Sequence, residues 1–323
     1  MGGYLIRPKK LGSTATDWPD GKRFAFTIVD DTDCATVENA RPVYDFLLEL
    51  GIRSTKTVWP LACTDQPTTG GSTLEEPEYR EWILELQRCG VEIAFHGAAD
   101  GSSPRQRVIA GLDRFRELLG ADPRLHANHT GQREGIYWGE ARLDGLARLA
   151  YLAATRARGY GRRYGGHDAS TEYFWGDVCR DRITYVRNFV FRGINTTRYD
   201  PLMPYHDARR PYVSYWFSCS EGPDAASFCE TIAEENQDRL VEEGGGCLMY
   251  THFGAGFTQN GRLHPEFARL MRRLAALQGW FVPASTLLDH LRSQASWAPD
   301  RDPALLRRMQ WRWLGSKLLH GTS

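Results

Sequence analysis

The sequence has neither a long apolar run nor a net charge. No segment reaches the roughly 20 apolar residues that span a membrane, and residues 1–21 contain no apolar run of signal-peptide length. The 40 lysines and arginines balance the 40 aspartates and glutamates. A neutral chain has no long-range field to hold a phosphate backbone, so we expect no nucleic-acid partner. These absences predict a cytoplasmic protein.

Paired cysteines are also missing. The seven cysteines are an odd number, lie far apart along the chain and form no C-x-x-C pair. This pattern is typical of reduced thiols. It argues against both a small disulfide-stabilised fold and a cysteine-based zinc knuckle.

What the sequence does contain is an alternation of apolar runs and amphipathic segments. The run FAFTIV (Phe24 to Val29) is typical of a buried parallel strand, and the helix pattern after it begins at Thr36 and ends at Gly51. We expect further strands at residues 55–59, 91–95, 125–128, 247–251 and 280–282. Repeated strand–helix units predict an α/β fold with a parallel sheet inside and helices outside. We count roughly seven units, which is enough to close a barrel.

The middle of the chain, residues 159–220, shows no clean period. It is rich in Tyr, Trp, Arg and Gly, and we expect strands with long loops that shape a substrate site. Regular helix patterns return at 224–243, 265–277 and 285–291. We therefore predict an N-terminal extension over 1–21, one barrel domain over 22–295 and a basic, aromatic helical tail over 296–323.

Ionisable residues follow four of the predicted strands. Asp30 and Asp31 follow the first, and His96, His129 and His252 follow three others. In parallel α/β folds the carboxyl ends of the strands meet on one face, where active sites are built. Mixed histidine and carboxylate ligands suit Zn²⁺ or another divalent transition metal. Such an ion lowers the pKa of a water molecule and polarises a carbonyl group, as amide hydrolysis requires.

The order of these motifs resembles the polysaccharide deacetylase (NodB-type, carbohydrate esterase family 4) superfamily. The resemblance covers about residues 22–292, and the segments that carry it are TIVDDTD (27–33), VEIAFHGAAD (91–100), HANHTGQREGIYWG (126–139), LMYTHFGAGF (248–257) and GWFVPASTLLDHL (279–291). It implies a distorted (β/α)7 barrel that removes N- or O-acetyl groups from sugars with a divalent metal, Zn²⁺ being the first candidate. It makes Asp30 the catalytic base and His252 the acid that protonates the leaving amine. It also makes Asp31 and His96 metal ligands.

The motifs depart from the family pattern at three places. Asp100 stands where the family has its second metal histidine, so the third ligand is either Asp100 or His129. If a helical turn follows the strand, His96 and Asp100 share one face of it and can hold one ion. Thr32 and Asp33 replace the usual Gly-Pro after the paired aspartates, and the family's Arg-Pro-Tyr segment is absent.

Several polar and aromatic side chains are candidates for substrate contact. Arg133 and Tyr137 lie near the position of the missing segment, and tryptophans can stack on sugar rings, although aromatic residues are more often part of a core. The predicted substrate-binding residues are His129, Arg133, Tyr137, Trp138 and Trp175.

The predicted function is a metal-dependent hydrolase that deacetylates an amino-sugar-containing glycan precursor. Because we see no export signal, we expect a nucleotide-linked or lipid-linked substrate. Two alternatives stay open. The chain could be an inactive barrel that binds a sugar or acts as a scaffold in glycan assembly. It could instead be a non-sugar amidase or a metal-independent glycosidase, which would need two carboxylates flanking the substrate.

The tail has a composition of its own. Residues 303–319 mix leucine and tryptophan with several basic residues, as in a helix that lies on an anionic membrane. The alternative is a helix that docks on the barrel while its arginines extend to solvent. We favour the docked helix and keep peripheral membrane contact as the second interpretation.

Overall fold

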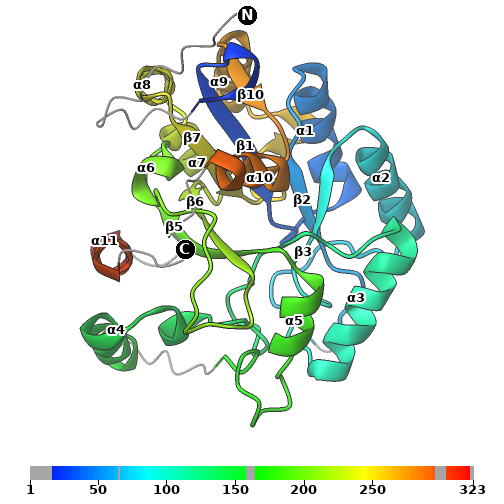
Figure 1. Ribbon diagram of the computed structural model, residues 1–323. Coiled ribbons are helices and arrows are strands. Elements are labelled where there is room, and N and C mark those ends of the chain that lie inside the picture. The colour runs from blue at the N-terminus through cyan, green and yellow to red at the C-terminus, as the bar shows by residue number, and fades with distance from the viewer. Residues whose placement is uncertain (1–16, 65, 158–163, 295–302, 321–323) are drawn as a thin grey trace, which may run out of the picture.

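Figure 1 shows the computed structural model of the protein, which describes residues 17–64, 66–157, 164–294 and 303–320. Most of the predicted N-terminal extension, residues 1–16, lies outside the described residues. So do the first residues of the predicted tail, 296–302.

Seven parallel strands form a closed barrel. Each strand pairs with the next, and β1 also pairs with β7. The strands are β1 (Phe24–Asp30), β2 (Thr55–Val58), β3 (Glu92–Phe95), β4 (Leu125–His126), β5 (Tyr185–Phe191), β6 (Tyr215–Glu221) and β7 (Gly246–Thr251). The predicted (β/α)7 barrel is therefore confirmed.

The barrel is distorted around β1. The edge of β1 that faces away from β7 pairs with two strands. Residues Phe24–Phe26 pair with β10 (Gly279–Phe281), and only Val29 and Asp30 pair with β2. The short strands β8 (Thr258–Gln259) and β9 (Arg262–Leu263) form a separate antiparallel pair.

Helices surround the strands, with α1 to α3 on one side of the barrel and α4 and α11 on the other (Figure 1). The longer ones are α1 (Val37–Glu49), α2 (Pro77–Arg88), α3 (Arg105–Leu119), α4 (Gly145–Ala157), α8 (Glu234–Glu243), α9 (Pro265–Ala276), α10 (Ala284–Gln294) and α11 (Pro303–His320). The shorter ones are α5 (Gly176–Arg182), α6 (Thr196–Tyr199), α7 (Ala225–Thr231) and the 3₁₀ turns η1 (Pro19–Gly21) and η2 (Gly139–Arg142).

Local sequence explains where the first helix begins and ends. Thr36 and Asn39 form a reciprocal capping box, in which each side chain accepts a hydrogen bond from the other residue's backbone N–H. At the other end Gly51 takes a φ of 74°, a left-handed conformation that favours glycine. The predicted start and stop of this helix are confirmed.

The helix predicted over 224–243 is two helices, α7 and α8. The side chain of Asn236 donates hydrogen bonds to the carbonyls of Glu230 and Thr231, both at 3.1 Å. These bonds satisfy carbonyl groups at the end of α7, and the chain turns there before α8 begins. The periodicity of apolar residues continued across this turn, so it did not reveal the break.

The alternation of side chains along β1 separates the barrel interior from the helix layer. Ala25 and Val29 pack in one buried cluster with residues of other strands, whereas Phe24, Phe26 and Ile28 belong to the cluster shared with the surrounding helices. Side chains of a strand point alternately to opposite faces. An odd-numbered residue directly after β1 therefore points into the barrel, on the same side as Ala25 and Val29.

The last helix, α11, packs on the barrel. Leu306, Met309, Trp313 and Leu314 are buried, and Trp313 lies 5.6 Å from the ring of Phe189 on β5. Among the residues described, no helix is both long enough and apolar enough to cross a membrane.

Candidate metal centre at the carboxyl end of the barrel

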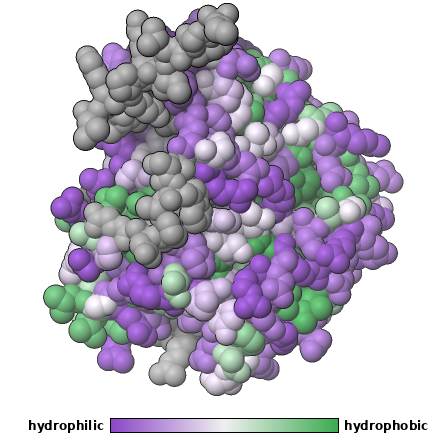
Figure 2. Space-filling view, in the orientation of Figure 1, coloured by the Kyte–Doolittle hydropathy of each residue, from purple (hydrophilic) through white to green (hydrophobic). Residues whose placement is uncertain are grey.

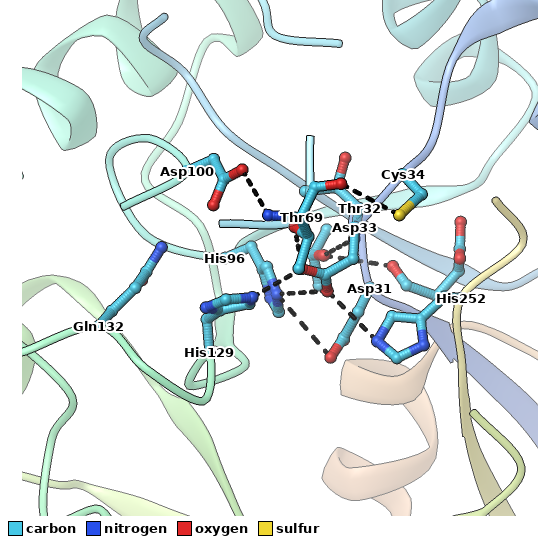
Figure 3. A network of polar contacts seen from close by, with 12 residues as sticks. Asp31, Thr32, Asp33, Cys34, Thr69, His96, Asp100, His129, Gln132 and His252 are labelled. Carbon is cyan, nitrogen blue, oxygen red and sulfur yellow. Dashed lines mark hydrogen bonds and ion pairs between the residues drawn. The ribbon is translucent and has the colours of Figure 1, made fainter. Parts of the chain in front are cut away.

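Three histidines converge on the carboxylate of Asp33 (Figure 3). The Nε2 atoms of His96 and His252 lie 3.1 and 3.2 Å from Asp33 Oδ2. The Nε2 atom of His129 lies 2.7 Å from Oδ1 of the same carboxylate. Asp33, His96 and His129 are buried, and His252 is partly buried. Three of the predicted strand-end side chains, those of His96, His129 and His252, therefore meet at one place.

The fold explains why these side chains meet. His96 and His252 directly follow β3 and β7, His129 lies three residues beyond β4, and Asp33 lies three residues beyond β1. All four strands are parallel members of one closed barrel, so their carboxyl ends share one rim.

Asp31 lies beside this cluster and is held by an arginine. Both nitrogens at the end of the Arg187 guanidinium contact its carboxylate, with Nη1 at 2.8 Å from Oδ1, and the two side chains are almost completely buried. The guanidinium also lies over the ring of Tyr250, 4.6 Å from its centre. Asp31 Oδ2 is 3.9 Å from His96 Nε2. The arginine therefore fixes Asp31 at the edge of the cluster.

The charges of the cluster shift its pKa values. Burial alone would raise the pKa of Asp33, but the nearby histidines hold it well below its usual value. Burial would likewise raise the pKa of Asp31, and Arg187 outweighs it and lowers that pKa. For His129 and His252 burial favours the neutral form, yet the contact with Asp33 raises both pKa values. Both carboxylates are therefore ionised at neutral pH.

The side chains fit a divalent metal ion. Ligand atoms of Asp33, His96 and His129 all lie within 4.8 Å of one another, and so do those of Asp31, Asp33 and His252. One carboxylate with two imidazoles is a donor set that zinc and similar ions accept. In addition, His252 Nδ1 donates a hydrogen bond to the Pro223 carbonyl at 2.7 Å, which fixes the ring with Nε2 towards the cluster.

The comparisons with known proteins agree with this architecture. No model of a known protein family matches the chain, and neither does any curated protein. Among solved structures, the allantoinase Puue superposes with a TM-score of 0.51 at 12% identity, over 91% of this chain and 100% of that one. The chain therefore shares its (β/α)7 barrel fold with this allantoinase.

Two further similar structures are named as deacetylases. One is a probable polysaccharide deacetylase from Pseudomonas aeruginosa PAO1, with 12% identity, a TM-score of 0.49 and coverage of 88% of this chain and 95% of that one. The other is the peptidoglycan deacetylase PdaC from Bacillus subtilis, with 10% identity, a TM-score of 0.39 and coverage of 84% and 92%. At such identities the similarity concerns the fold alone.

Asp30 lies outside the cluster at the rim of the barrel. Like Phe26 and Ile28, it is an even-numbered residue of β1, so its side chain points into the layer between β1 and the helices. There Lys56 Nζ lies 2.9 Å from Oδ2, the Tyr44 hydroxyl donates to Oδ2 at 3.0 Å, and the Phe253 N–H donates to Oδ1 at 2.7 Å. Burial alone would lower the pKa of Lys56, but Asp30 raises it. The structure thus places Asp30 in a buried ion pair.

Asp100 also lies apart from the three histidines (Figure 3). The chain after His96 bends at Gly97, which has a φ of 120°, and does not form a helical turn. Asp100 Oδ2 accepts hydrogen bonds from the backbone N–H groups of Thr69 and Gly70 at 3.0 and 2.8 Å. The Thr69 hydroxyl in turn donates to Asp33 Oδ1 at 2.8 Å. Asp100 therefore supports the loop that orients Asp33.

The other four predicted substrate-binding residues contact partners outside the cluster. Trp175 is buried and donates from Nε1 to the Glu134 carbonyl at 2.7 Å, and the Trp138 ring is covered by the Arg142 guanidinium. The ring of Tyr137 lies 4.5 Å from that of His167. Arg133 is exposed and lies over the ring of Tyr173. Among the described residues none of these four side chains pairs with Asp33.

Two residues of the site were not predicted from the sequence. Asp33 lies two residues after Asp31, and that spacing in an extended chain was the available signal for a side chain on the same face. Arg187 stands alone among apolar residues in the strand segment YVRNFVF, where a buried charge needs a partner.

Proposed function

We propose that this protein is a metal-dependent hydrolase that removes an acetyl group from an amino-sugar-containing glycan precursor, nucleotide-linked or lipid-linked. The observation that carries the proposal is the buried set of Asp33, His96 and His129 beside the Arg187-held carboxylate of Asp31. Burying a carboxylate among three histidines carries a desolvation penalty that a structural role alone does not require. Such clusters of titratable groups concentrate at functional sites.

Asp33, His96 and His129 would hold the ion, for which Zn²⁺ is the first candidate. This set keeps His96 from the prediction and uses His129, the alternative to Asp100 that the sequence left open, whereas Asp33 takes the place of Asp31 as the carboxylate ligand. A bound divalent cation supplies Lewis acidity towards a carbonyl oxygen and a lower pKa for water. The hydrogen bond from Thr69 to Asp33 Oδ1 fixes the orientation of that carboxylate.

Asp31 would act as the general base in this scheme. Arg187 keeps its carboxylate ionised and fixed in direction, so Oδ2 can accept a proton from the attacking water. We propose this role for Asp31 in place of Asp30, because Asp31 lies beside the histidines whereas the carboxylate of Asp30 meets its partners outside the cluster.

His252 would act as the general acid. The contact with Asp33 outweighs burial and raises its pKa, which favours the imidazolium, and the Nδ1–H bond to the Pro223 carbonyl keeps the ring in place. Nε2 then donates its proton to the departing amine nitrogen. The same residue is the acid in the prediction made from the sequence.

A hydrolase of a non-sugar amide is the second candidate. A protein named as an allantoinase shares this fold, and a fold by itself does not fix the substrate. Both candidates use the same cluster, so substrate screening separates them.

The test is acetate release from a panel of nucleotide-linked and lipid-linked acetamido sugars by the zinc-loaded protein. We expect turnover of at least one substrate, loss of turnover with a chelator and recovery when zinc is added. Replacing the general acid, His252→Ala, should lower kcat about 100-fold or more. The exposed His206→Ala serves as the control and should leave kcat unchanged.

Three outcomes would count against the proposal. Absence of acetate release from every acetamido sugar, combined with hydrolysis of a non-sugar amide, would select the second candidate. Acetate release that persists in chelator would remove the metal from the account. Equal losses in His252→Ala and His206→Ala would remove the role of His252.

A further inference from the structure

Two neighbouring helices of the barrel, α4 and α11, contain no acidic residue. Neither 145–157 nor 303–320 includes an aspartate or glutamate, although the whole chain has as many acidic as basic residues. The exposed basic side chains on the two helices are Arg148, Arg156, Arg307, Arg308 and Arg312. Among the described residues none of these five forms an ion pair with a carboxylate, so this part of a neutral protein is locally positive.

The same helices carry the exposed apolar side chains. All five large hydrophobic residues that are exposed within the described part of the chain lie on α4 or α11: Leu146, Leu149, Trp311, Leu318 and Leu319. The exposed fraction reaches 74% for Leu146 and 80% for Leu319. Figure 2 shows hydrophobic surface at the corner where Figure 1 places α4. Water-exposed leucines gathered in one place indicate a surface that another phase or molecule covers.

The two helices form one supported surface. Gln310 on α11 is hydrogen-bonded to both the backbone N–H and the carboxylate of Asp144, which directly precedes α4, and the rings of Tyr151 and Trp313 lie 5.9 Å apart. Lys317 pairs with Glu221 at 2.9 Å and so joins α11 to β6. The inner face of α11 is therefore occupied by the barrel, whereas Arg307, Arg308 and Trp311 are exposed.

We propose that this α4–α11 face binds the surface of an anionic lipid bilayer. The leucines and Trp311 would enter the boundary between headgroups and acyl chains, and the arginines would contact lipid phosphates. On each helix one face packs on the protein, and the other carries apolar and basic residues together. No described helix can cross a membrane, so the contact is peripheral. This inference does not depend on the proposed activity.

The composition of the face argues against two other occupants. A second copy of the chain in a two-fold contact would place the arginines of one face against the same arginines of its partner, with no acidic residue to neutralise them. A nucleic acid would neutralise the arginines but would leave the leucines exposed.

The test is sedimentation of the full chain with vesicles of phosphatidylcholine, with and without phosphatidylglycerol. We expect binding to the anionic vesicles that weakens as salt is added, and little binding to phosphatidylcholine alone. The variant Arg307→Gln/Arg308→Gln should lower the partition coefficient about 25-fold, since each basic residue near an anionic surface contributes about fivefold. The matched control Arg88→Gln/Arg239→Gln changes two exposed arginines on α2 and α8 and should bind like the wild type.

A second measurement tests the apolar part. Vesicles with brominated acyl chains should quench the fluorescence of the wild type, and the quenching should be smaller in Trp311→Phe. The proposal is overturned if no vesicle sediments the protein or if the control variant loses binding equally. It is also overturned if the protein is a dimer in solution that Arg307→Gln/Arg308→Gln dissociates, because the face would then be a protein interface.

Discussion

The buried pair of Lys56 and Asp30 allows a sharp prediction about which carboxylate does chemistry. The two side chains are fully buried, and Lys56 Nζ lies 2.9 Å from Asp30 Oδ2. Lys56→Met keeps most of the side-chain volume but leaves a buried carboxylate without its cation. Removing one partner of a buried ion pair costs about 3–5 kcal/mol. Because Tyr44 and the Phe253 N–H still donate to Asp30, we expect the lower end, about 3 kcal/mol.

The double variant Lys56→Met/Asp30→Asn should recover most of this loss. It removes both charges together, and the introduced amide can still accept a hydrogen bond from the Phe253 N–H through its oxygen and donate one to the Tyr44 hydroxyl through its nitrogen. Replacing both members of a buried ion pair by neutral groups is often close to neutral in stability. Equilibrium unfolding in urea gives the free energies of the wild type, both single variants and the double variant, and thus the coupling between the two sites.

The same double variant separates a structural role of Asp30 from a catalytic one. If Asp30 only neutralises Lys56, the refolded double variant retains metal and acetate-releasing activity. Recovered stability with lost activity would show that Asp30 acts in catalysis, as the family resemblance implies. A loss below about 1 kcal/mol in Lys56→Met would refute the energetic argument itself.

Three further predictions concern single buried side chains. Burial raises the pKa of Glu134 from 4.5 to about 7, which favours its protonated form in the folded state. Glu134→Gln should therefore stabilise the protein by about 3 kcal/mol at about pH 8 and by nothing at about pH 4, measured by urea unfolding. Asp33 outweighs burial and raises the pKa of His129, which must be neutral to bind a metal, so zinc affinity should rise with pH across the range in which this imidazolium loses its proton, as chelator-competition titrations would measure. Trp313→Ala should cost about 3–5 kcal/mol in urea unfolding, because it removes a buried indole between α11, α4 and β5.

Each of these has an outcome that would contradict it. Stabilisation by Glu134→Gln that is the same at both pH values would mean that its ionisation has no energetic cost. A zinc affinity independent of pH would exclude His129 as a ligand that loses a proton. A cost below about 1 kcal/mol for Trp313→Ala would show that α11 is loosely docked; Trp311→Ala, on the exposed face of the same helix, is the matched control and should cost less.

The fold could be predicted from the sequence because its signals are local. Short apolar runs followed by amphipathic segments mark the strand–helix units, and Thr36 and Gly51 mark the start and end of the first helix. Parallel units then force the polar strand ends onto one rim. His96, His129 and His252 could therefore be placed near one another without a structure. The break between α7 and α8 could not, since it depends on where one asparagine side chain finds carbonyl partners.

The sequence could not show which carboxylates lie in the cluster and which lie outside it, because their positions depend on contacts between residues far apart in the chain. Asp31 is fixed by Arg187, 156 residues away, across the closed barrel. Asp30 points outward by strand parity and meets a lysine whose own position depends on the pairing of β1 with β2. Asp100 was expected to share a helical face with His96, and the bend at Gly97 directs it to the loop at Thr69 instead.

The most direct test of the central claim is the metal content of the purified protein, measured by mass spectrometry on the wild type, Asp33→Ala and Asp100→Ala. We expect about one zinc or similar ion per chain in the wild type, loss of the ion in Asp33→Ala and its retention in Asp100→Ala, with circular dichroism confirming that all three are folded. Absence of metal from the wild type even after zinc is added would contradict the account, and so would an ion that Asp33→Ala retains and Asp100→Ala loses.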